Sequence, residues 1–506
     1  MNYLRQSVFG LIVVGLICAV GMYALIQAHV HTIYGGRVEI ADYRSFEKPS
    51  ELTAIVNVNV LAPEGDRMLP ERTVVLDQGL IVSIEASGEA PASARLIDGR
   101  DQFLIPGLID GHVHLRRQPN DLLLYVANGI TQVRQLSGRP EDLSLKQDIE
   151  RGRIGPALYV ASPSLFSAGR IEGAWIAMTR PALNVRHAGR AEAVIDDLIE
   201  TGYDAIKTYD NLDLESFQRI NALARERDIY TLGHLPVGFD LNTLADIELA
   251  ELAHIEELIK KLLDEFTPYY ERGGHEGFLR FVEQRTPQIV SDLLETGTAV
   301  NTTLWFMDTL EHQAGDLVGA LKQIPLEYAN PGMVEGSRYA GMGWLPGMNR
   351  FQLPPDLDPD IRDNTVEFWR TRAEAHKVLL RALVAGNVAI TLGTDATVEG
   401  VVPGFSLHQE LITLQQSGLS PQQALASATL TLSDLMGTNG GSIAPGRDAD
   451  LVLLSANPLL DIGNTALIDT VILDGRVLDR TTLDGMLSAV RSAHANSRNF
   501  DLSRYQ

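Results

Sequence analysis

The chain has 506 residues, 45% of them hydrophobic, which is enough apolar material for a large core and for more than one domain. Its formal net charge is -23, from 65 acidic and 42 basic residues, and no basic tract interrupts this acidic background, so we expect no nucleic-acid partner. Cys18 is the single cysteine, which excludes intramolecular disulfides and thiolate metal clusters. Any metal must therefore be held by nitrogen and oxygen.

The first predicted element is an apolar helix near the N-terminus. Residues 8–26, VFGLIVVGLICAVGMYALI, are uncharged and about long enough to cross a bilayer. The apolar region of a cleaved signal peptide is usually shorter, at about 7 to 15 residues. We therefore predict a membrane anchor within residues 1–28, with secretion after signal cleavage as the alternative. Arg5 precedes the helix while Arg37 and Arg44 follow it, and the hypothesis is a catalytic body outside the cytoplasm, periplasmic in a Gram-negative cell.

Both ends of the remaining chain are rich in short β-runs. Residues 29–50 are polar and are interpreted as a linker, and residues 51–105 alternate β-prone runs with turn residues. Residues 437–485 repeat that pattern, and residues 486–506 are assigned to a C-terminal tail. We predict that the two β-rich segments form one small β-sandwich.

The long middle segment has an α/β pattern. Between residues 106 and 436, apolar strands such as VAITLG alternate with helical stretches such as AEAVIDDLIETG, and about eight such units fit a (β/α)₈ TIM barrel. A doubly wound open sheet is the alternative, weakened because no glycine-rich nucleotide motif follows the early strands. Residues 307–387 are too long for a simple connection. They are predicted to be an insertion that either shapes the site or is merely peripheral.

Polar side chains recur where the predicted strands end. The stretch LIPGLIDGHVHLRR closes a strand with two imidazoles on one side of it. In a parallel barrel the carboxyl ends of all strands open onto one rim, so distant residues converge there. A lone buried histidine is more often a hydrogen-bonded core residue, but the combination favours a metal site. Its members are His112, His114, Lys207, His234, His254 and Asp395.

The motifs PGLIDGHVH, GTD and GSIAPGRDADLVLL, with the strand-end residues between them, resemble the amidohydrolase superfamily of metal-dependent hydrolases. The segments IKTYDNLDLESF, GHLP and LAHIEEL look more like its imidazolonepropionase-related, prolidase-like branch. The resemblance implies that His112, His114 and Asp395 bind one metal and that His234 and His254 bind a second. It also implies that Lys207, as a CO₂-derived carbamate, bridges two divalent ions.

The resemblance implies hydrolysis of an amide or dipeptide-like C–N bond by a metal-bridging hydroxide, with Asp395 as the general base. Zn(II) is the expected metal, and Mn(II), Co(II) and Fe(II) remain open. Deaminase members usually carry a glutamate three residues after the strand-5 histidine, where this chain has Val237. Deamination is therefore disfavoured.

Three further residues are candidates for binding a small-molecule substrate. Arg116 and Arg134 would pair with a substrate carboxylate, and Tyr209 would donate a hydrogen bond to a developing oxyanion. Surface solvation or packing is the competing interpretation for each. Hydrolysis of a lactone, ester or phosphotriester at the same metal site is an alternative activity. The non-enzymatic alternative is a protein that serves as a ligand-binding scaffold. A homo-oligomer is left open.

Overall fold

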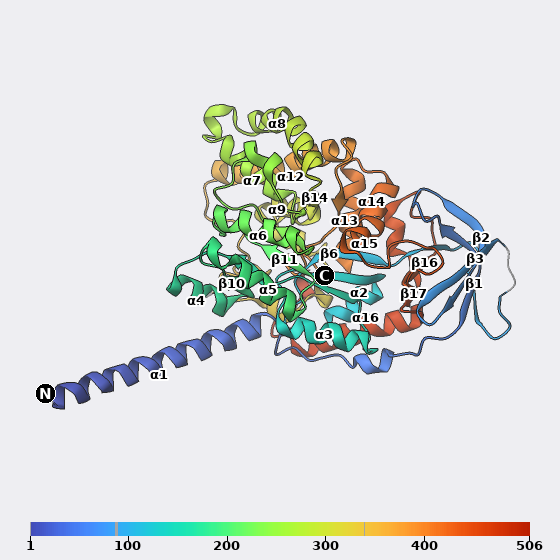
Figure 1. Ribbon diagram of the computed structural model, residues 1–506, viewed down its shortest axis with the longest axis horizontal. Helices are drawn as coiled ribbons and strands as arrows, with labels where there is room; N and C mark the ends of the chain where they lie inside the picture. Colours follow the sequence, from blue (N-terminus) through green and yellow to red (C-terminus); the bar gives the residue numbers. More distant parts are fainter. Residues whose placement is uncertain (1, 87–89, 338–339, 506) are drawn as a thin grey trace.

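The computed structural model describes residues 2–86, 90–337 and 340–505. One long helix, α1 (Asn2–Ile33), projects from the body, and a β-sheet lies at the opposite side of the molecule (Figure 1). Helices surround the parallel strands of the body between these two features. These helices are α2 (Asp121–Ala127), α3 (Pro140–Glu150), α4 (Arg170–Thr179), α5 (Ala191–Thr201), α6 (Leu214–Glu226), α7 (Glu256–Glu265), α8 (Gly274–Thr296), α9 (Leu304–Gly315), α10 (Leu317–Leu321), α11 (Pro331–Glu335), α12 (Pro359–Ala385), α13 (Phe405–Gln416), α14 (Pro421–Ser427), α15 (Leu430–Met436) and α16 (Arg480–Ser497).

Over Val13–Ile33, α1 is long and apolar enough to cross a membrane. Side chains such as Ile17, Val20 and Leu25 are largely exposed. The other end of α1 is attached to the body, where Ile33 is buried and Gln27 Nε2 donates a hydrogen bond of 2.6 Å to the Met178 carbonyl at the end of α4. Residues 29–33, expected within a polar linker, are therefore helical because this part of α1 packs against α4 and α11.

The two ends of the chain meet in one eight-stranded sheet, in the order β18-β17-β16-β5-β1-β2-β3 with β4 beside β1. The joining pair is antiparallel β5 and β16, with Leu104 opposite Leu453 and Ile105 opposite Val452. These apolar side chains are buried, which stabilises the pairing. The strands are β1 (Thr53–Leu61), β2 (Met68–Asp77), β3 (Leu80–Ala86), β4 (Arg95–Asp98), β5 (Phe103–Pro106), β16 (Leu451–Leu454), β17 (Ile468–Leu473) and β18 (Arg476–Asp479).

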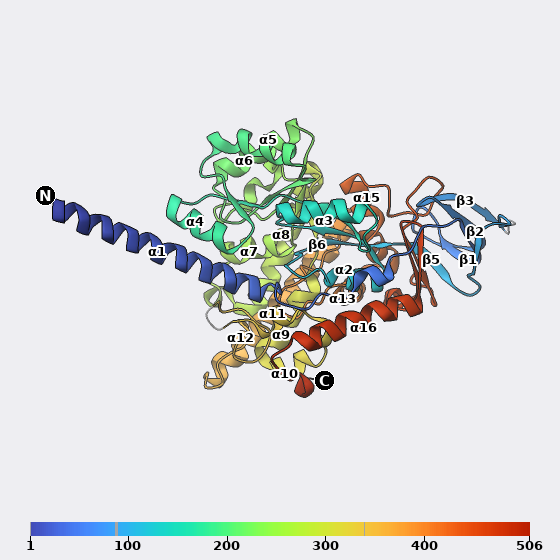
Figure 2. The same cartoon turned by 90° about the horizontal axis from the view of Figure 1, so that it is seen from below.

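The segment after this sheet is a helix. Residues 486–506 were expected to be a tail, but most of them belong to α16, which packs against α2 (Figure 2). Leu483, Met486 and Val490 are buried on one side of α16, three or four residues apart. That spacing is typical of an amphipathic helix and explains why the segment folds onto the body.

The middle of the chain forms two parallel sheets, β6-β7-β8 and β10-β9-β11-β12-β13-β14-β15. Single parallel bridges join them at both margins: Ala161 pairs with Ala205, and Val113 pairs with Ala396. The strands are β6 (Leu108–Val113), β7 (Ile130–Gln135), β8 (Ala157–Val160), β9 (Ser164–Phe166), β10 (Ala182–Asn184), β11 (Ala205–Thr208), β12 (Tyr230–Gly233), β13 (Glu251–Leu252), β14 (Ala299–Asn301) and β15 (Ile390–Thr391).

Helices and short turns follow most strands, so the middle segment has the alternating α/β organisation that the sequence predicted. Every residue of β6 and of β11 is buried, as expected for strands covered on both faces. Two segments add to this pattern. The β9–α4–β10 excursion contacts α1, and residues 307–387 consist largely of α9 to α12.

Candidate metal centre

His112 and His114 lie at the end of β6, and Asp395 follows β15. Asp395 Oδ1 lies 3.5 Å from His112 Nε2 and 3.1 Å from His114 Nε2. The backbone holds the two segments together, because the Asp395 amide donates to the His112 carbonyl at 2.8 Å and the His114 amide donates to the Ala396 carbonyl. Asp395 has a positive φ of 60°, a strained conformation for a non-glycine residue and one often found at functional sites.

The hydrogen bonds of the first two imidazoles define their ligand atoms. His112 Nδ1 donates to the Ala253 carbonyl at 3.1 Å, and His114 Nδ1 donates to the Leu136 carbonyl at 2.6 Å. A carbonyl only accepts, so each Nδ1 carries the proton and each Nε2 presents a lone pair beside Asp395. This orientation of a histidine by a backbone carbonyl is common at metal sites.

His234 and His254 complete the imidazole cluster. The His254 ring stacks on the His112 ring with centroids 4.4 Å apart, and it lies 5.1 Å from the His234 ring. His254 Nδ1 contacts Thr303 Oγ1 at 3.0 Å, and His234 Nδ1 lies 2.9 Å from Glu257 Oε1. Burial raises the pKa of Glu257, but the charges of His234 and Lys260 outweigh burial and hold that pKa well below its usual range.

Lys207 comes from the end of β11 and is only 1% exposed. Burial lowers the pKa of its ammonium group to about 7, against the opposing pull of Asp395 and Glu257. Among the described residues, Nζ has no hydrogen-bond partner. A buried ammonium without a partner is costly, so another chemical state of this side chain is favoured.

The cluster has the composition of a divalent-metal site. One nitrogen each from His112 and His254 and one oxygen from Asp395 lie within 4.8 Å of one another. His112 Nε2, like Lys207 Nζ, is buried without a hydrogen-bond partner in the described chain. Imidazole and carboxylate groups suit Zn(II) and other first-row divalent ions, so these residues fit such an ion.

The three predicted substrate-binding residues have different surroundings. The centroids of the Tyr209 and His234 rings lie 4.6 Å apart. Arg116 stacks on Tyr34, directly after α1, 4.8 Å from its ring centroid, in a pocket that also includes His114. Arg134 does not reach this pocket. It is fully buried, with Nε donating to the Gly111 carbonyl at 2.6 Å and its two terminal nitrogens on Glu251, so the proposed carboxylate-binding role of Arg134 is incorrect.

Several contributing residues were not found from the sequence. Glu257 and Thr303 orient imidazoles, and α1 contributes Tyr23 and Gln27 to the pocket beside His114. Glu257 stands three residues after His254 in AHIEEL, but its partner His234 belongs to another strand. Only the folded chain brings these groups together.

Comparisons with known proteins agree with this arrangement. The profile of the Amidohydrolase family matches residues 103–478. Imidazolonepropionase from Geobacillus kaustophilus (strain HTA426) is 23% identical over 407 residues, covering 77% of this chain and 85% of the relative.

Two solved structures resemble the fold at low sequence identity. A bottromycin amidohydrolase superposes with a TM-score of 0.66 at 24% identity, covering 89% of this chain and 92% of that one. A prolidase complexed with N-methylphosphonate-L-proline superposes with a TM-score of 0.60 at 19% identity, covering 85% and 100%. Divalent metal ions are typical of this family. The chain therefore belongs to the amidohydrolase family, and it is a hydrolase of carbon–nitrogen bonds.

Proposed function

We propose that this chain is a binuclear metal-dependent amidohydrolase built on a closed (β/α)₈ barrel. The bridges Ala161–Ala205 and Val113–Ala396 support closure, since they join the two parallel sheets at both margins. Strands β6, β7, β8, β11, β12, β13, β14 and β15 would then form the ring. The metal cluster would lie at the carboxyl ends of these strands, where barrel enzymes carry their active sites.

His112, His114 and Asp395 would hold one ion, and His234 and His254 would hold a second. Lys207, carboxylated by CO₂, would bridge them, because a carbamate replaces a buried ammonium by a bidentate anion. Zn(II) is the favoured metal. When bound, the ions supply an acidified hydrolytic water and polarise the scissile carbonyl.

The residues of the chain then perform the proton chemistry. Burial raises the pKa of Asp395, but its contact with His114 outweighs burial and holds that pKa below its usual range, so the carboxylate is ionised at neutral pH and can accept a proton. Asp395 would take the proton from the attacking water and deliver it to the leaving nitrogen. Burial raises the pKa of Tyr209, which stays protonated and would donate to the developing oxyanion.

The observation that carries this proposal is the convergence of six residues from five segments, one of them a buried lysine without a hydrogen-bond partner in the described chain. The test is metal analysis of the full chain and of Lys207→Ala. We expect about two equivalents per wild-type chain and loss of bound metal in Lys207→Ala, with turnover reduced by at least ~10²-fold. Lys146→Ala is the matched control, because Lys146 pairs with Asp204 outside the cluster. A Lys207→Ala variant with full metal and full turnover would contradict the bridging role.

The bond cleaved is tested with a panel of substrates. Dipeptides and N-acyl amino acids represent the proposed amide class, and lactones, esters and phosphotriesters represent the alternative. We expect metal-loaded wild-type protein to turn over the amides. Turnover confined to the other group would overturn the amide assignment and leave the metal site standing.

We also propose that α1 anchors the chain in a membrane, with the catalytic body outside the cytoplasm. The apolar stretch Val13–Ile33 and the exposed side chains along it support the anchor. A cleaved signal sequence is the alternative. It is weakened by the contacts of α1 with α4 and α11, since cleavage near residue 28 would remove part of that packing.

A further inference from the structure

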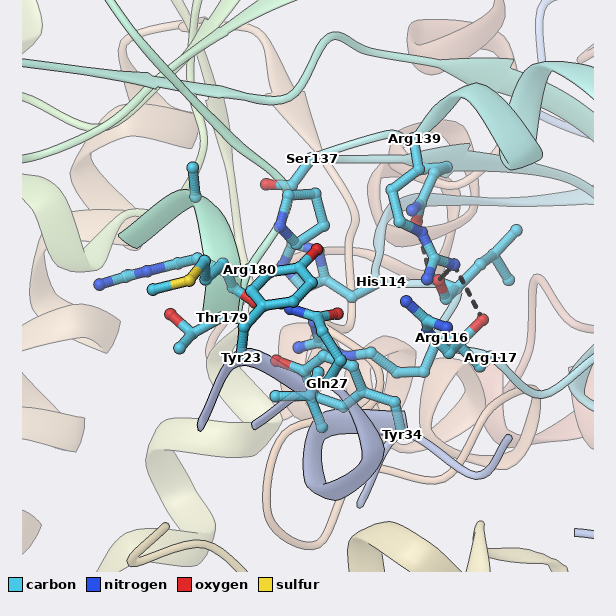
Figure 3. A pocket seen from close by; sticks show the side chains of 16 residues that line it. Tyr23, Gln27, Tyr34, His114, Arg116, Arg117, Ser137, Arg139, Thr179 and Arg180 are labelled. Carbon is cyan, nitrogen blue, oxygen red and sulfur yellow. Dashed lines mark hydrogen bonds between the residues drawn. The ribbon is translucent and has the colours of Figure 1, made fainter. Parts of the chain in front are cut away.

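A pocket of about 320 Å³ opens beside His114. Its walls come from the segments after β6 and β7, from the end of α4, from α1, which supplies Tyr23, Gln27 and Val30, and from Tyr34 directly after α1. Figure 3 shows Tyr23 and Gln27 of α1 between Arg180 and Arg116 in that view. The family profile begins at residue 103, so the α1 wall lies outside the part of the chain that it matches.

The pocket is positively charged although the whole chain carries a net charge of -23. Arg116, Arg117, Arg139 and Arg180 line it, and none of the described lining residues is acidic. Arg139 is already engaged, because it pairs with Asp142 at 3.3 Å and donates to two carbonyls. Arg116 and Arg180 form no ion pair with any described residue, so their charges are available to an anionic ligand.

Arg116 and Arg180 lie near ligands of both proposed ions, His114 for the first and His234 for the second. Arg116 follows His114 by two residues, and both line the pocket. Arg180 lies over the Tyr209 ring, 5.7 Å from its centroid, and Tyr209 in turn contacts His234. An anion held by these arginines would therefore place a neighbouring bond near the ions.

The remaining wall is apolar and continues outward along α1. Val30 and Met178 face the pocket, and beyond it α1 exposes Val20 and Leu25. Residues of α4, which packs on α1, are also exposed: Trp175 at 54% and Ile171 at 89%. Tryptophan is favoured at the membrane interface, and this surface is contiguous with the predicted anchor. An apolar chain can thus extend from the pocket along α1.

We propose that α1 forms one wall of the substrate site and that this pocket binds an amphiphile, an amino-acid carboxylate joined through an amide to a medium or long acyl chain. Arg116 and Arg180 would hold the carboxylate, and the acyl chain would lie against α1 and the end of α4. The inference rests on the proposed amidohydrolase function and deepens it. It assigns the N-terminal helix a role in substrate binding besides anchoring.

The test measures binding of N-(octylsulfonyl)glycine, whose sulfonamide replaces the scissile amide, to the full chain in phosphatidylcholine nanodiscs. Its methyl ester lacks the anion, and N-(methylsulfonyl)glycine lacks the chain. We expect each of these to bind at least about tenfold more weakly than the parent compound. Empty nanodiscs provide the correction for partitioning into lipid.

Variants then assign the contacts. Arg116→Met and Arg180→Met should each weaken binding of the parent compound about tenfold and leave binding of the methyl ester unchanged. Tyr23→Ala should weaken binding of the long-chain compounds several-fold, without affecting N-(methylsulfonyl)glycine. The controls are Arg219→Met on α6 and Val14→Ala, an exposed residue of α1 nearer the N-terminus than any residue of the pocket; both should bind as wild type.

Three results would overturn the inference. They are equal binding of N-(octylsulfonyl)glycine and its methyl ester, equal binding of N-(octylsulfonyl)glycine and N-(methylsulfonyl)glycine, or arginine and Tyr23 variants that bind the parent compound as wild type does.

Failure of the proposed function is a separate result. In that case binding would still depend on Arg116, Arg180 and Tyr23, but the metal-loaded chain would hydrolyse neither N-octanoylglycine nor any other amide.

Discussion

At the scale of single residues, a buried ion pair crosses the interior of the parallel strands. Arg134 and Glu251 are both fully buried, and Glu251 also accepts hydrogen bonds from Tyr230 and Thr391 at 2.8 Å. A buried pair of this kind adds little net stability, yet removing one partner leaves an uncompensated charge. Arg134 and Glu251 are therefore each required to neutralise the other inside the fold that carries the metal ligands.

Arg134→Met should lower the free energy of unfolding by about 3–5 kcal/mol, because it leaves Glu251 charged and unpaired. Urea unfolding followed by circular dichroism measures this change. The double variant Arg134→Met/Glu251→Met should recover part of the loss. Arg227→Met removes a surface ion pair with Asp196 and should cost only ~0–1 kcal/mol. Equal losses in the two single variants would contradict the structural role of Arg134.

Asp121, in the first turn of α2, predicts a pH dependence of stability. Burial raises its pKa from 3.8 to about 8, so the folded chain keeps this carboxyl protonated at neutral pH while the unfolded chain ionises it. The unfolded state then binds fewer protons, and this group makes stability fall as the pH rises from about 4 to 8. Asp121→Asn removes that contribution. The Tm advantage of the variant over wild type should grow between pH 5 and pH 7.5, and a constant difference would contradict the assignment.

The candidate ligands were predictable from the sequence because each lies at or just after the end of an apolar strand. The structure brings the four histidines and Asp395 together, and it buries Lys207 close to Asp395. Whether they bind metal stays a prediction. The role of Arg134 was predicted wrongly because an arginine near a strand end can point either toward the substrate pocket or into the protein core. The sequence does not distinguish the two, since its partner Glu251 lies far away in the chain, on β13. Long-range pairs of this kind leave no local pattern.

At the scale of elements, the site depends on the close approach of β6 to the segment after β15. A Cβ atom on Gly393 would lie 2.4 Å from the His112 Cβ and 2.4 Å from Asn301 Oδ1. Such distances are shorter than any ordinary contact, so a larger residue must displace His112 or its neighbours. Glycine at this position thus permits the geometry of the first two imidazoles.

Gly393→Ala should reduce metal affinity by about 10-fold or more, because a shift of His112 disturbs the ligand set. The measurement is competition with a chromophoric chelator, with Tm as a check on folding. Gly437→Ala is the control: this glycine has a φ of 65°, which disfavours alanine, but its Cβ would meet open space. It should affect stability slightly and leave metal affinity unchanged. An unaffected metal affinity in a folded Gly393→Ala variant would contradict the argument.

The helical and strand pattern of the middle segment was readable from apolar periodicity, whereas α16 was not recognised. Its buried face, with Leu483, Met486 and Val490, follows helical spacing, but it comes directly after β18 and was absorbed into the β-rich segment and the tail. The β9–α4–β10 excursion was also missed. Its strands are too short to give a periodic signal.

At the scale of the whole molecule, the apolar helix α1 is the basis for the proposed membrane location. We expect the full chain to remain with membranes after a carbonate wash and to expose its body to protease added outside the cytoplasm. The double variant Ile17→Arg/Val20→Arg should release it, since each central arginine costs ~2.5–3.5 kcal/mol on insertion. Leu460→Arg, on an exposed residue of the body, is the control. Recovery of a soluble, N-terminally shortened wild-type chain would instead support signal cleavage.

The pairing of β5 with β16 also constrains how the protein is made. The partner of β5 begins at Leu451, several hundred residues after β5 ends at Pro106. At ~5–20 residues per second, a ribosome needs tens of seconds to supply it. During that interval the nascent β5 edge has no strand to close it and is open to aggregation. In the proposed export of the body, the pairing would instead wait until β16 has also crossed the membrane.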